Sequence, residues 1–202
     1  MDRRTAYIIL NLLPGVGPLR VHQLLTLLGS PEAILATSAG ALAGVPGIGG
    51  KLADTLSGWR RRCDPDKELE LTERAGVTLI TREDDAYPAL LREIHDPPLC
   101  LYVRGDCSAL SRLRGGIAMV GSRRTTLYGV SMAETLAAAA AYAGWAVVSG
   151  LARGIDTVVH ESVLNAGGCT VAVIGSGLGR IYPQENIGLA RRIAESGGAV
   201  VS

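Results

Sequence analysis

Residues 117–156 read IAMVGSRRTTLYGVSMAETLAAAAAYAGWAVVSGLARGID, and this stretch decides the fold. The apolar run 117–120 is typical of a strand buried on both faces. It ends in a glycine-containing turn, and an alanine-rich helical pattern follows over 128–142. A second apolar run, 145–148, and a second such turn, 149–156, repeat the unit. Strand–turn–helix units in succession predict parallel strands joined by right-handed crossovers, and therefore an α/β fold.

A third unit follows the first two. Residues 170–174 form an apolar run, residues 175–183 a glycine-rich turn, and a helical pattern near 186–195 leads to a last strand at 199–201. The glycines are spaced G-x-G-x-G, and no helix is expected before Pro183. The pyrophosphate cradle of a dinucleotide site is therefore not laid out as required. We expect no nicotinamide and no other cofactor.

The turns of these units are predicted to lie at the carboxyl ends of neighbouring strands, where open α/β sheets bind ligands. Glycine lets the backbone approach a ligand, successive amides point outward, and arginine adds a planar fork suited to phosphate. Arg123 directly follows the first strand and is the strongest candidate for a phosphate contact. An extended backbone would point Arg124 to the other side, and Arg153 could contact the ligand or pair with Asp156. The predicted phosphate-binding residues are Gly121, Ser122, Arg123, Arg124, Ser149, Gly150, Ala152, Arg153, Gly154, Gly175 and Gly177.

The charge distribution agrees with an anion site in this part of the chain. The 202 residues carry a net charge of only +1, but eight arginines against five acids give residues 112–202 a charge of +3. Four arginines and no acid occur between Asp106 and Glu134. Local charge at a turn matters more for a phosphate-bearing partner than the overall balance.

Composition and cysteine spacing narrow the class of protein. A hydrophobic content of 48% with 19% charged residues indicates an ordinary globular protein. The N-terminus is neither a secretory signal nor a membrane span, so we expect a cytoplasmic protein with no membrane partner. The cysteines fit no zinc spacing, so we expect no metal site and free, buried thiols at Cys63, Cys100, Cys107 and Cys169.

The first part of the chain predicts a helical domain with an internal repeat. Residues 5–57 have helical patterns, and Leu13-Pro14-Gly15-Val16-Gly17 recurs as Val45-Pro46-Gly47-Ile48-Gly49. The repeat resembles the helix-hairpin-helix motif, in which such a turn exposes amides to a DNA phosphate. Lys51 can add a cation to the second copy, so Gly47, Gly49 and Lys51 are a candidate secondary DNA contact. Tight packing of helices is the alternative role of these turns.

We expect two domains, a helical one over residues 1–75 and an α/β one over residues 76–202. The apolar runs 77–80 and 99–103 predict short strands at the edge of the sheet. The arginines at positions 60–62 are interpreted as the solvated end of a helix rather than as a partner site.

Together these motifs resemble the DNA-processing protein A family (DprA, also called Smf). The resemblance rests on the order and spacing of short motifs over about half of the chain. It implies a Rossmann-like parallel sheet preceded by a SAM-like or helix-hairpin-helix domain. The matching residues are Tyr87-Pro88, Asp96-Pro97-Pro98, Leu101-Tyr102, Val120-Gly121-Ser122-Arg123, Tyr128-Gly129, Ser149–Asp156, His160, Gly167-Gly168, Gly175-Ser176-Gly177-Leu178, Tyr182-Pro183 and Asn186.

The resemblance implies a protein that binds single-stranded DNA entering the cell during natural transformation. Such a protein protects the strand and helps to load the RecA recombinase onto it, without catalysis. Members of the family continue beyond the point that corresponds to Ser202, so we expect this chain to end inside the Rossmann-like domain. The family forms homodimers largely through the later part, and the resemblance implies a homodimer for the full-length protein only.

Three other functions are compatible with parts of the sequence. A related Rossmann-like fold binds nucleotides or hydrolyses their N-glycosidic bond, but its Pro-Gly-Gly-x-Gly-Thr loop is absent from these residues. A helix-hairpin-helix glycosylase would need a catalytic Asp further from the turn than Asp54. A ligand-sensing domain remains open, because fold alone does not specify function. Asp156 and His160, four positions apart, are interpreted as packing and capping residues rather than as a catalytic pair.

Overall fold

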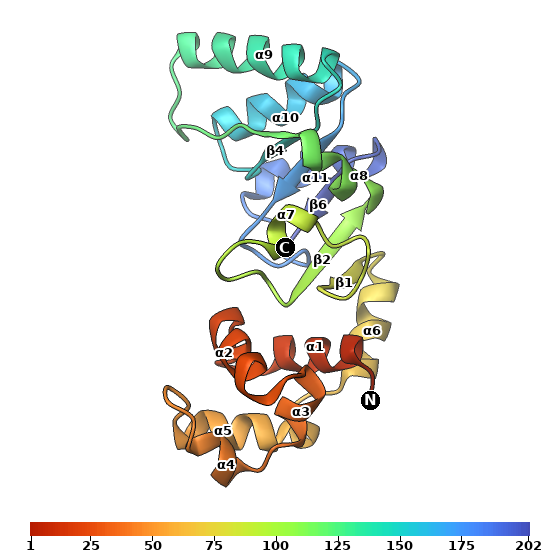
Figure 1. Cartoon of the computed structure of the whole chain (residues 1–202). Helices are drawn as coiled ribbons and strands as arrows, with labels where there is room; N and C mark the ends of the chain where they lie inside the picture. The colour runs from red at the N-terminus through yellow and green to blue at the C-terminus, as the bar shows by residue number, and fades with distance from the viewer. The chain divides into compact units, whose positions relative to one another are not determined.

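Two compact units make up the computed structural model, which describes all residues from Met1 to Ser202 (Figure 1). The helical unit comprises Met1–Ala75 and Leu79–Leu101, and the α/β unit comprises Gly76–Thr78 and Tyr102–Ser202. The division into domains 1–75 and 76–202 stays a prediction. None of the helices combines the length and the apolar character that crossing a bilayer requires.

The helices of the helical unit begin at residues that favour a helix start. Asp2 accepts the amide hydrogen of Thr5 at 2.7 Å, and serine or aspartate side chains cap α3, α4 and α6 in the same way. Such caps satisfy amides that the first helical turn leaves without a partner. The elements of this part are α1 (Arg3–Leu12), α2 (Pro18–Leu28), α3 (Pro31–Ala36), α4 (Ala39–Ala43), α5 (Gly50–Ser57), the 3₁₀ turn η1 (Trp59–Arg61), α6 (Pro65–Arg74), β1 (Thr78–Thr81) and α7 (Ala89–Arg92).

The Pro-Gly repeat forms two similar turns, one before α2 and one before α5. Gly15 and Gly47 have φ of 77° and 80°, a left-handed conformation that glycine adopts without strain. Gln23 on α2 donates from Nε2 to the carbonyl oxygen of Pro46 at 2.6 Å, so the two turns are joined directly. The predicted helical domain at the N-terminus is confirmed.

The α/β unit is built on the predicted parallel strands. Ile117 pairs with Val147, and the strand order of the whole sheet is β1-β2-β6-β5-β4-β3. Strands β3 to β6 are parallel, as predicted, whereas β2 pairs antiparallel with β6 through Val103 and Val201. The elements are β2 (Cys100–Gly105), α8 (Ser108–Arg112), η2 (Leu113–Gly115), β3 (Ile117–Ala118), α9 (Leu127–Tyr142), β4 (Val147–Ser149), α10 (Ile155–Asn165), β5 (Thr170–Val173), η3 (Gln184–Asn186), α11 (Ile187–Glu195) and β6 (Ala199–Val201).

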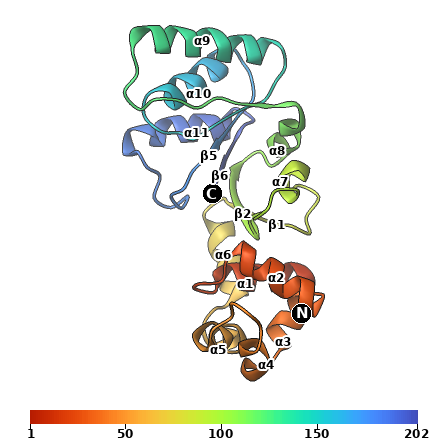
Figure 2. The same cartoon turned by 60° about the vertical axis from the view of Figure 1, so that its left-hand side comes forward.

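Helix α10 packs against both α9 and α11 (Figure 2). The contact between α9 and α10 uses small side chains, because Ala133, Ala137 and Ala140 on α9 are buried together with Val159 and Val163 on α10. Alanine lets the two helix axes approach closely without leaving a void. This packing holds the first turn of α10 beside the ends of β3 and β4, where the candidate site lies.

The cysteines are all free thiols, as the sequence predicts. Cys100 alone is buried, and burial raises the pKa of its thiol to about 12. The other three are partly exposed, which differs from the expectation of buried thiols.

Candidate nucleic-acid interface

Three turns of the α/β unit meet at a cavity of about 400 Å³. They follow β3, β4 and β5, so the cavity lies at the carboxyl ends of these strands, as predicted for the binding site of an open α/β sheet. The cavity is lined by Arg123, Arg124, Gly150, Ala152, Arg153, Ile174, Gly175, Ser176, Tyr182 and Pro183.

Arg124 lies on the same cavity as Arg123, contrary to the expectation that it points to the other side. The backbone is not extended there. The hydroxyl of Ser122 donates to the carbonyl oxygen of Arg124 at 2.6 Å and accepts its amide hydrogen at 3.1 Å. This turn brings both exposed guanidinium groups to the cavity, and neither forms an ion pair with a carboxylate.

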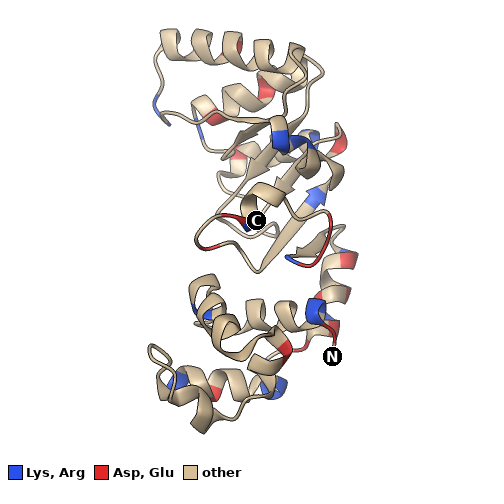
Figure 3. Cartoon of the chain, in the orientation of Figure 1, with Lys and Arg blue, Asp and Glu red and all other residues tan.

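The cations of this region lie in the turns rather than on the neighbouring helix (Figure 3). Helix α9 carries a single charged residue, Glu134, whereas the loop that leads into it holds two adjacent arginines. An anion at the cavity therefore meets concentrated positive charge from one short segment.

Asp156 connects the first two turns from inside the unit. Its carboxylate is 5% exposed and accepts the amide hydrogens of Gly121 at 3.3 Å, Gly150 at 3.1 Å and Ala152 at 3.4 Å. These three amides were predicted to face a ligand, but in this structure they donate to a buried carboxylate. The residues therefore shape the site, and the exposed guanidinium groups of Arg123 and Arg124 are donors without a carboxylate partner.

Gly154 is also a scaffold residue. It has φ of 79°, and a Cβ atom there would collide with the carbonyl oxygen of Ser122. The amide of Ile155 donates to the same oxygen at 3.1 Å, so the first turn rests directly on the start of α10. Glycine at this position allows that close approach.

Arg153 is paired with Glu185 and not with Asp156, which corrects one of the two predicted roles. The guanidinium contacts both carboxylate oxygens of Glu185, with Nη2 3.1 Å from Oε2. Both side chains are about half exposed. Hydrogen bonding to Arg153 lowers the pKa of Glu185 to about 2, so the pair is charged at neutral pH.

Five of the predicted residues do not line the cavity: Gly121, Ser122, Ser149, Gly154 and Gly177. Ser149 is 2% exposed, so it belongs to the interior of β4 rather than to the turn surface. Gly177 is exposed in the third turn, where its carbonyl oxygen accepts the amide hydrogen of Arg180 at 2.9 Å. Gly175 lines the cavity, together with Ser176, which belongs to the family motif but is not among the predicted phosphate-binding residues.

Asn186 fixes the second turn. Its Nδ2 donates to the carbonyl oxygen of Leu151 at 2.8 Å and to Oγ1 of Thr157 at 2.9 Å. Leu151 has φ of 56°, which is a costly conformation for a residue with a branched side chain. The bond from Asn186 helps to hold it there. The family motif includes this asparagine, but no sequence pattern shows which turn it supports.

His160 is fully buried, and its Nδ1 lies 2.8 Å from the hydroxyl of Thr170. That hydroxyl donates to the carbonyl oxygen of Val147 at 2.8 Å, so its lone pair accepts the Nδ1 hydrogen of the histidine. Burial lowers the pKa of His160 to about 4, and the ring is neutral at physiological pH. These contacts fit the predicted packing role.

The candidate secondary contact lies in the helical unit. Gly47, Gly49 and Lys51 line a cavity of about 460 Å³ next to the two Pro-Gly turns. Gly49 precedes α5 and supplies no side-chain cap, so amides of the first helical turn lack a side-chain acceptor.

Known proteins match both parts of the chain. A model of the DNA recombination-mediator protein A family matches residues 78–202, and a model of the SAM-like helix-hairpin-helix tandem matches residues 8–57. Protein Smf of Synechocystis is 35% identical over 185 residues, which are 91% of this chain and 46% of that protein. The chain spans less than half the length of the curated relatives it matches.

Two solved structures are similar in fold. DNA processing protein A from Streptococcus pneumoniae superposes with a TM-score of 0.73 at 27% identity, over the whole of this chain and 67% of that one. DNA processing protein A from Helicobacter pylori superposes with a TM-score of 0.53 at 30% identity, over 62% of this chain and 54% of that one, and that protein binds single-stranded DNA. The resemblance that the motifs predict is confirmed, and the chain belongs to the DNA recombination-mediator protein A family.

Proposed function

We propose that this chain binds single-stranded DNA through its backbone phosphates at the cavity formed by the three turns. The observation that carries the proposal is the pair Arg123 and Arg124, two exposed guanidinium groups on one cavity with no carboxylate partner. Guanidinium forks bind phosphate with charge-assisted hydrogen bonds. Single-stranded DNA binding by the Helicobacter pylori relative supports the choice of ligand.

Binding of this kind is indifferent to base sequence. Contacts to phosphates carry no sequence information, and the affinity falls as salt replaces the released counterions. Stacking on bases adds a second term in many single-strand binders, and the chain has few aromatic residues and no Phe. Tyr182 is the aromatic side chain on the cavity, and it is 63% exposed.

The wider role is proposed from the family. In the full-length protein, which we propose to be a homodimer, the bound strand would be protected and passed to RecA during natural transformation, in the cytoplasm. We propose binding without a chemical step, and the contacts of the buried His160 and Asp156 with the fold support this.

Titration of the whole chain with labelled oligo-dT tests the proposal. Arg123→Ala should weaken binding about tenfold to a hundredfold, since a charge-assisted contact contributes roughly 1.5–3 kcal/mol. Arg123→Lys should recover only part of the loss, because lysine keeps the charge but not the fork. Arg192→Ala is the matched control, since Arg192 makes one exposed hydrogen bond of 3.4 Å and lies outside the cavity. Equal small losses for Arg123→Ala and Arg192→Ala would move the site elsewhere.

A further inference from the structure

Five cations near the Pro-Gly turns and the end of α5 form no ion pair with a carboxylate. Arg20 and Lys51 follow the two Pro-Gly turns, and three consecutive arginines follow α5. The ion pairs of the structure include none of the five, although Arg3, Arg4 and Arg74 of the same unit are paired. We refer to Arg60, Arg61 and Arg62 as the arginine ledge.

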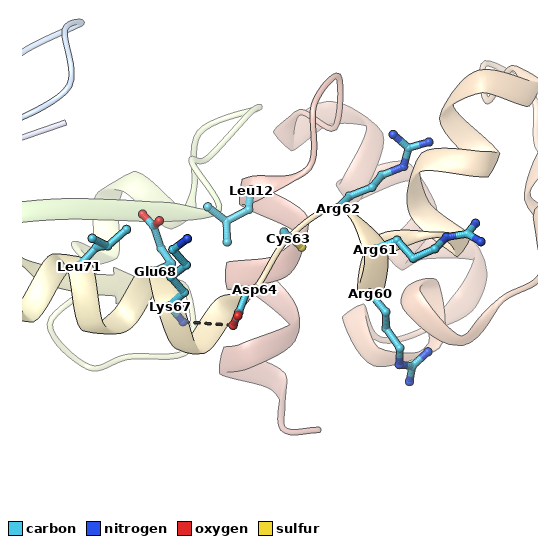
Figure 4. A pocket seen from close by; sticks show the side chains of 9 residues that line it. All are labelled: Leu12, Arg60, Arg61, Arg62, Cys63, Asp64, Lys67, Glu68 and Leu71. Atoms are coloured by element: carbon cyan, nitrogen blue, oxygen red, sulfur yellow. Dashed lines mark hydrogen bonds between the residues drawn. The ribbon is translucent and has the colours of Figure 1, made fainter.

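Two adjoining cavities share Arg62. The first, of about 460 Å³, is lined by Pro14, Gly15, Arg20, Gly47, Gly49, Lys51, Leu52, Thr55 and Arg62, and it has no acidic residue. The second, of about 530 Å³, is lined by Leu12, Arg60, Arg61, Arg62, Cys63, Asp64, Lys67, Glu68 and Leu71 (Figure 4). Asp64 caps α6 by accepting the amide hydrogens of Asp66 and Lys67, both at 3.1 Å. Because Arg62 lines both cavities, the cations of the hairpins adjoin those of the ledge, and Asp64 and Glu68 are the acids on the lining.

The backbone of the ledge is held in place. The indole of Trp59 donates to the carbonyl oxygen of Leu35 at 3.3 Å, and the guanidinium of Arg60 lies 4.5 Å from the centre of the Trp59 ring. The amide of Arg62 donates to the carbonyl oxygen of Trp59 at 2.9 Å. A Cβ atom at Gly58 would lie 2.8 Å from the carbonyl oxygen of Asp54, so this turn packs closely on α5. A fixed turn presents its charges in one arrangement.

The arrangement suits a long polyanion rather than one small anion. Figure 4 shows the three arginine side chains pointing in different directions from the turn, so they do not converge on one point. Charges spread along a surface match a ligand with repeated charges. The glycines at 17, 49 and 50 have open space above them, and the first turn of α5 has no side-chain cap. Phosphodiester groups can approach such amides closely.

We propose that the arginine ledge extends the candidate contact of the hairpins into a second nucleic-acid surface, formed by residues other than those of the cavity of the α/β unit. The inference rests on the proposed function, because it assumes that the chain handles DNA. It extends the candidate contact at Lys51 to Arg20, Arg61 and Arg62. It also revises the interpretation of residues 60–62 as the solvated end of a helix.

Salt-dependent titration of the full chain with oligo-dT tests the second surface. The double variant Arg61→Ala/Arg62→Ala should lower the slope of log affinity against log salt by about 1.4, at about 0.7 per phosphate contact on a single strand. It should also weaken binding about tenfold at low salt. Arg60 is left in place because of its contact with Trp59. The matched control is Arg191→Ala/Arg192→Ala on α11, which removes the same charge outside both surfaces.

The outcomes separate this inference from the proposed function. If Arg61→Ala/Arg62→Ala leaves the slope of log affinity against log salt unchanged and Arg123→Ala loses much of the affinity for oligo-dT, the second surface is overturned. The proposed binding at the cavity of the α/β unit then stands. A reduced slope in the double variant, with no effect of Arg123→Ala, supports the second surface and overturns the proposed binding at the cavity of the α/β unit. Poly-glutamate serves as a competitor, and displacement of oligo-dT at equal charge concentration would identify a surface for acidic peptides and overturn the assignment to nucleic acid.

Discussion

Arg153 and Glu185 form an ion pair across the rim of the candidate site, 32 residues apart in the chain, with Nη2 3.1 Å from Oε2. The carboxylate occupies the guanidinium fork that a phosphate would use. A phosphate at this position must therefore compete with an anion that belongs to the protein. Arg123 and Arg124 have no such competitor.

Removing the competing carboxylate should strengthen DNA binding. Glu185→Gln frees Arg153 and removes one negative charge from the rim, so we expect the affinity for oligo-dT to rise severalfold. The pKa of Glu185, lowered to about 2, implies that mild acid does not mimic the substitution. Fluorescence anisotropy at fixed salt measures the change. Glu161→Gln, an exposed glutamate on α10, is the control, and an equal gain there would show a general charge effect.

Asp156 should be required for the shape of the site. Asp156→Ala leaves the amides of Gly121, Gly150 and Ala152 without an acceptor, so we expect a loss of about 3 kcal/mol in the free energy of unfolding at roughly 1 kcal/mol per hydrogen bond. Denaturant unfolding measures it. Asp156→Asn keeps a carbonyl oxygen and should lose less. Unfolding midpoints equal to that of Glu161→Ala would rule out the bridging role.

His160 should make the α/β unit sensitive to acid. Burial lowers the pKa of His160 in the folded state to about 4, below the ordinary value near 6.5. Between pH 4 and pH 6.5 the unfolded chain therefore binds more protons than the folded one. Stability is therefore full above pH 6.5 and falls as the pH drops toward 4, by up to about 3 kcal/mol. Denaturant unfolding at several pH values in this range measures how the free energy of unfolding changes with pH. His160→Gln should flatten this dependence, whereas the exposed His95→Gln should not.

Gly154 should not tolerate a side chain. Gly154→Ala combines φ of 79° with a collision against the carbonyl oxygen of Ser122, so we expect at least 1 kcal/mol of destabilisation and a loss of DNA affinity. Thermal unfolding and oligo-dT titration measure the two effects. Gly179→Ala is the control in the third turn, since a Cβ there has open space. Similar results for the two variants would contradict close packing of the first two turns.

Local patterns were sufficient for the elements and the family. Apolar runs and glycine turns placed β4, β5 and β6, because buried strands need continuous apolar residues. The expectation that 117–120 is buried on both faces was wrong, because β3 spans only Ile117–Ala118 at the edge of the sheet and Val120 is exposed. The Pro-Gly repeat placed both hairpins, because its glycines at 15 and 47 adopt φ that other residues avoid. The order of the motifs identified the family, and the family model that matches residues 78–202 confirms it.

Long-range contacts decided the details of the site. The direction of Arg124 depends on the hydroxyl of Ser122, and the partner of Arg153 depends on where the third turn brings Glu185. Whether an amide faces a ligand or Asp156 depends on the packing of α10 beneath two strands.

The sequence by itself determined the α/β class, the helical N-terminal part, the family and the turns that bear cations. These follow from the periodicity and spacing of residues that are near one another in the chain. The tertiary structure alone decided which cations remain unpaired, which amides are already occupied and which arginines share a cavity. Hydrogen bonds and ion pairs form between groups that folding brings together, and their partners lie tens of residues away, beyond the reach of any local pattern.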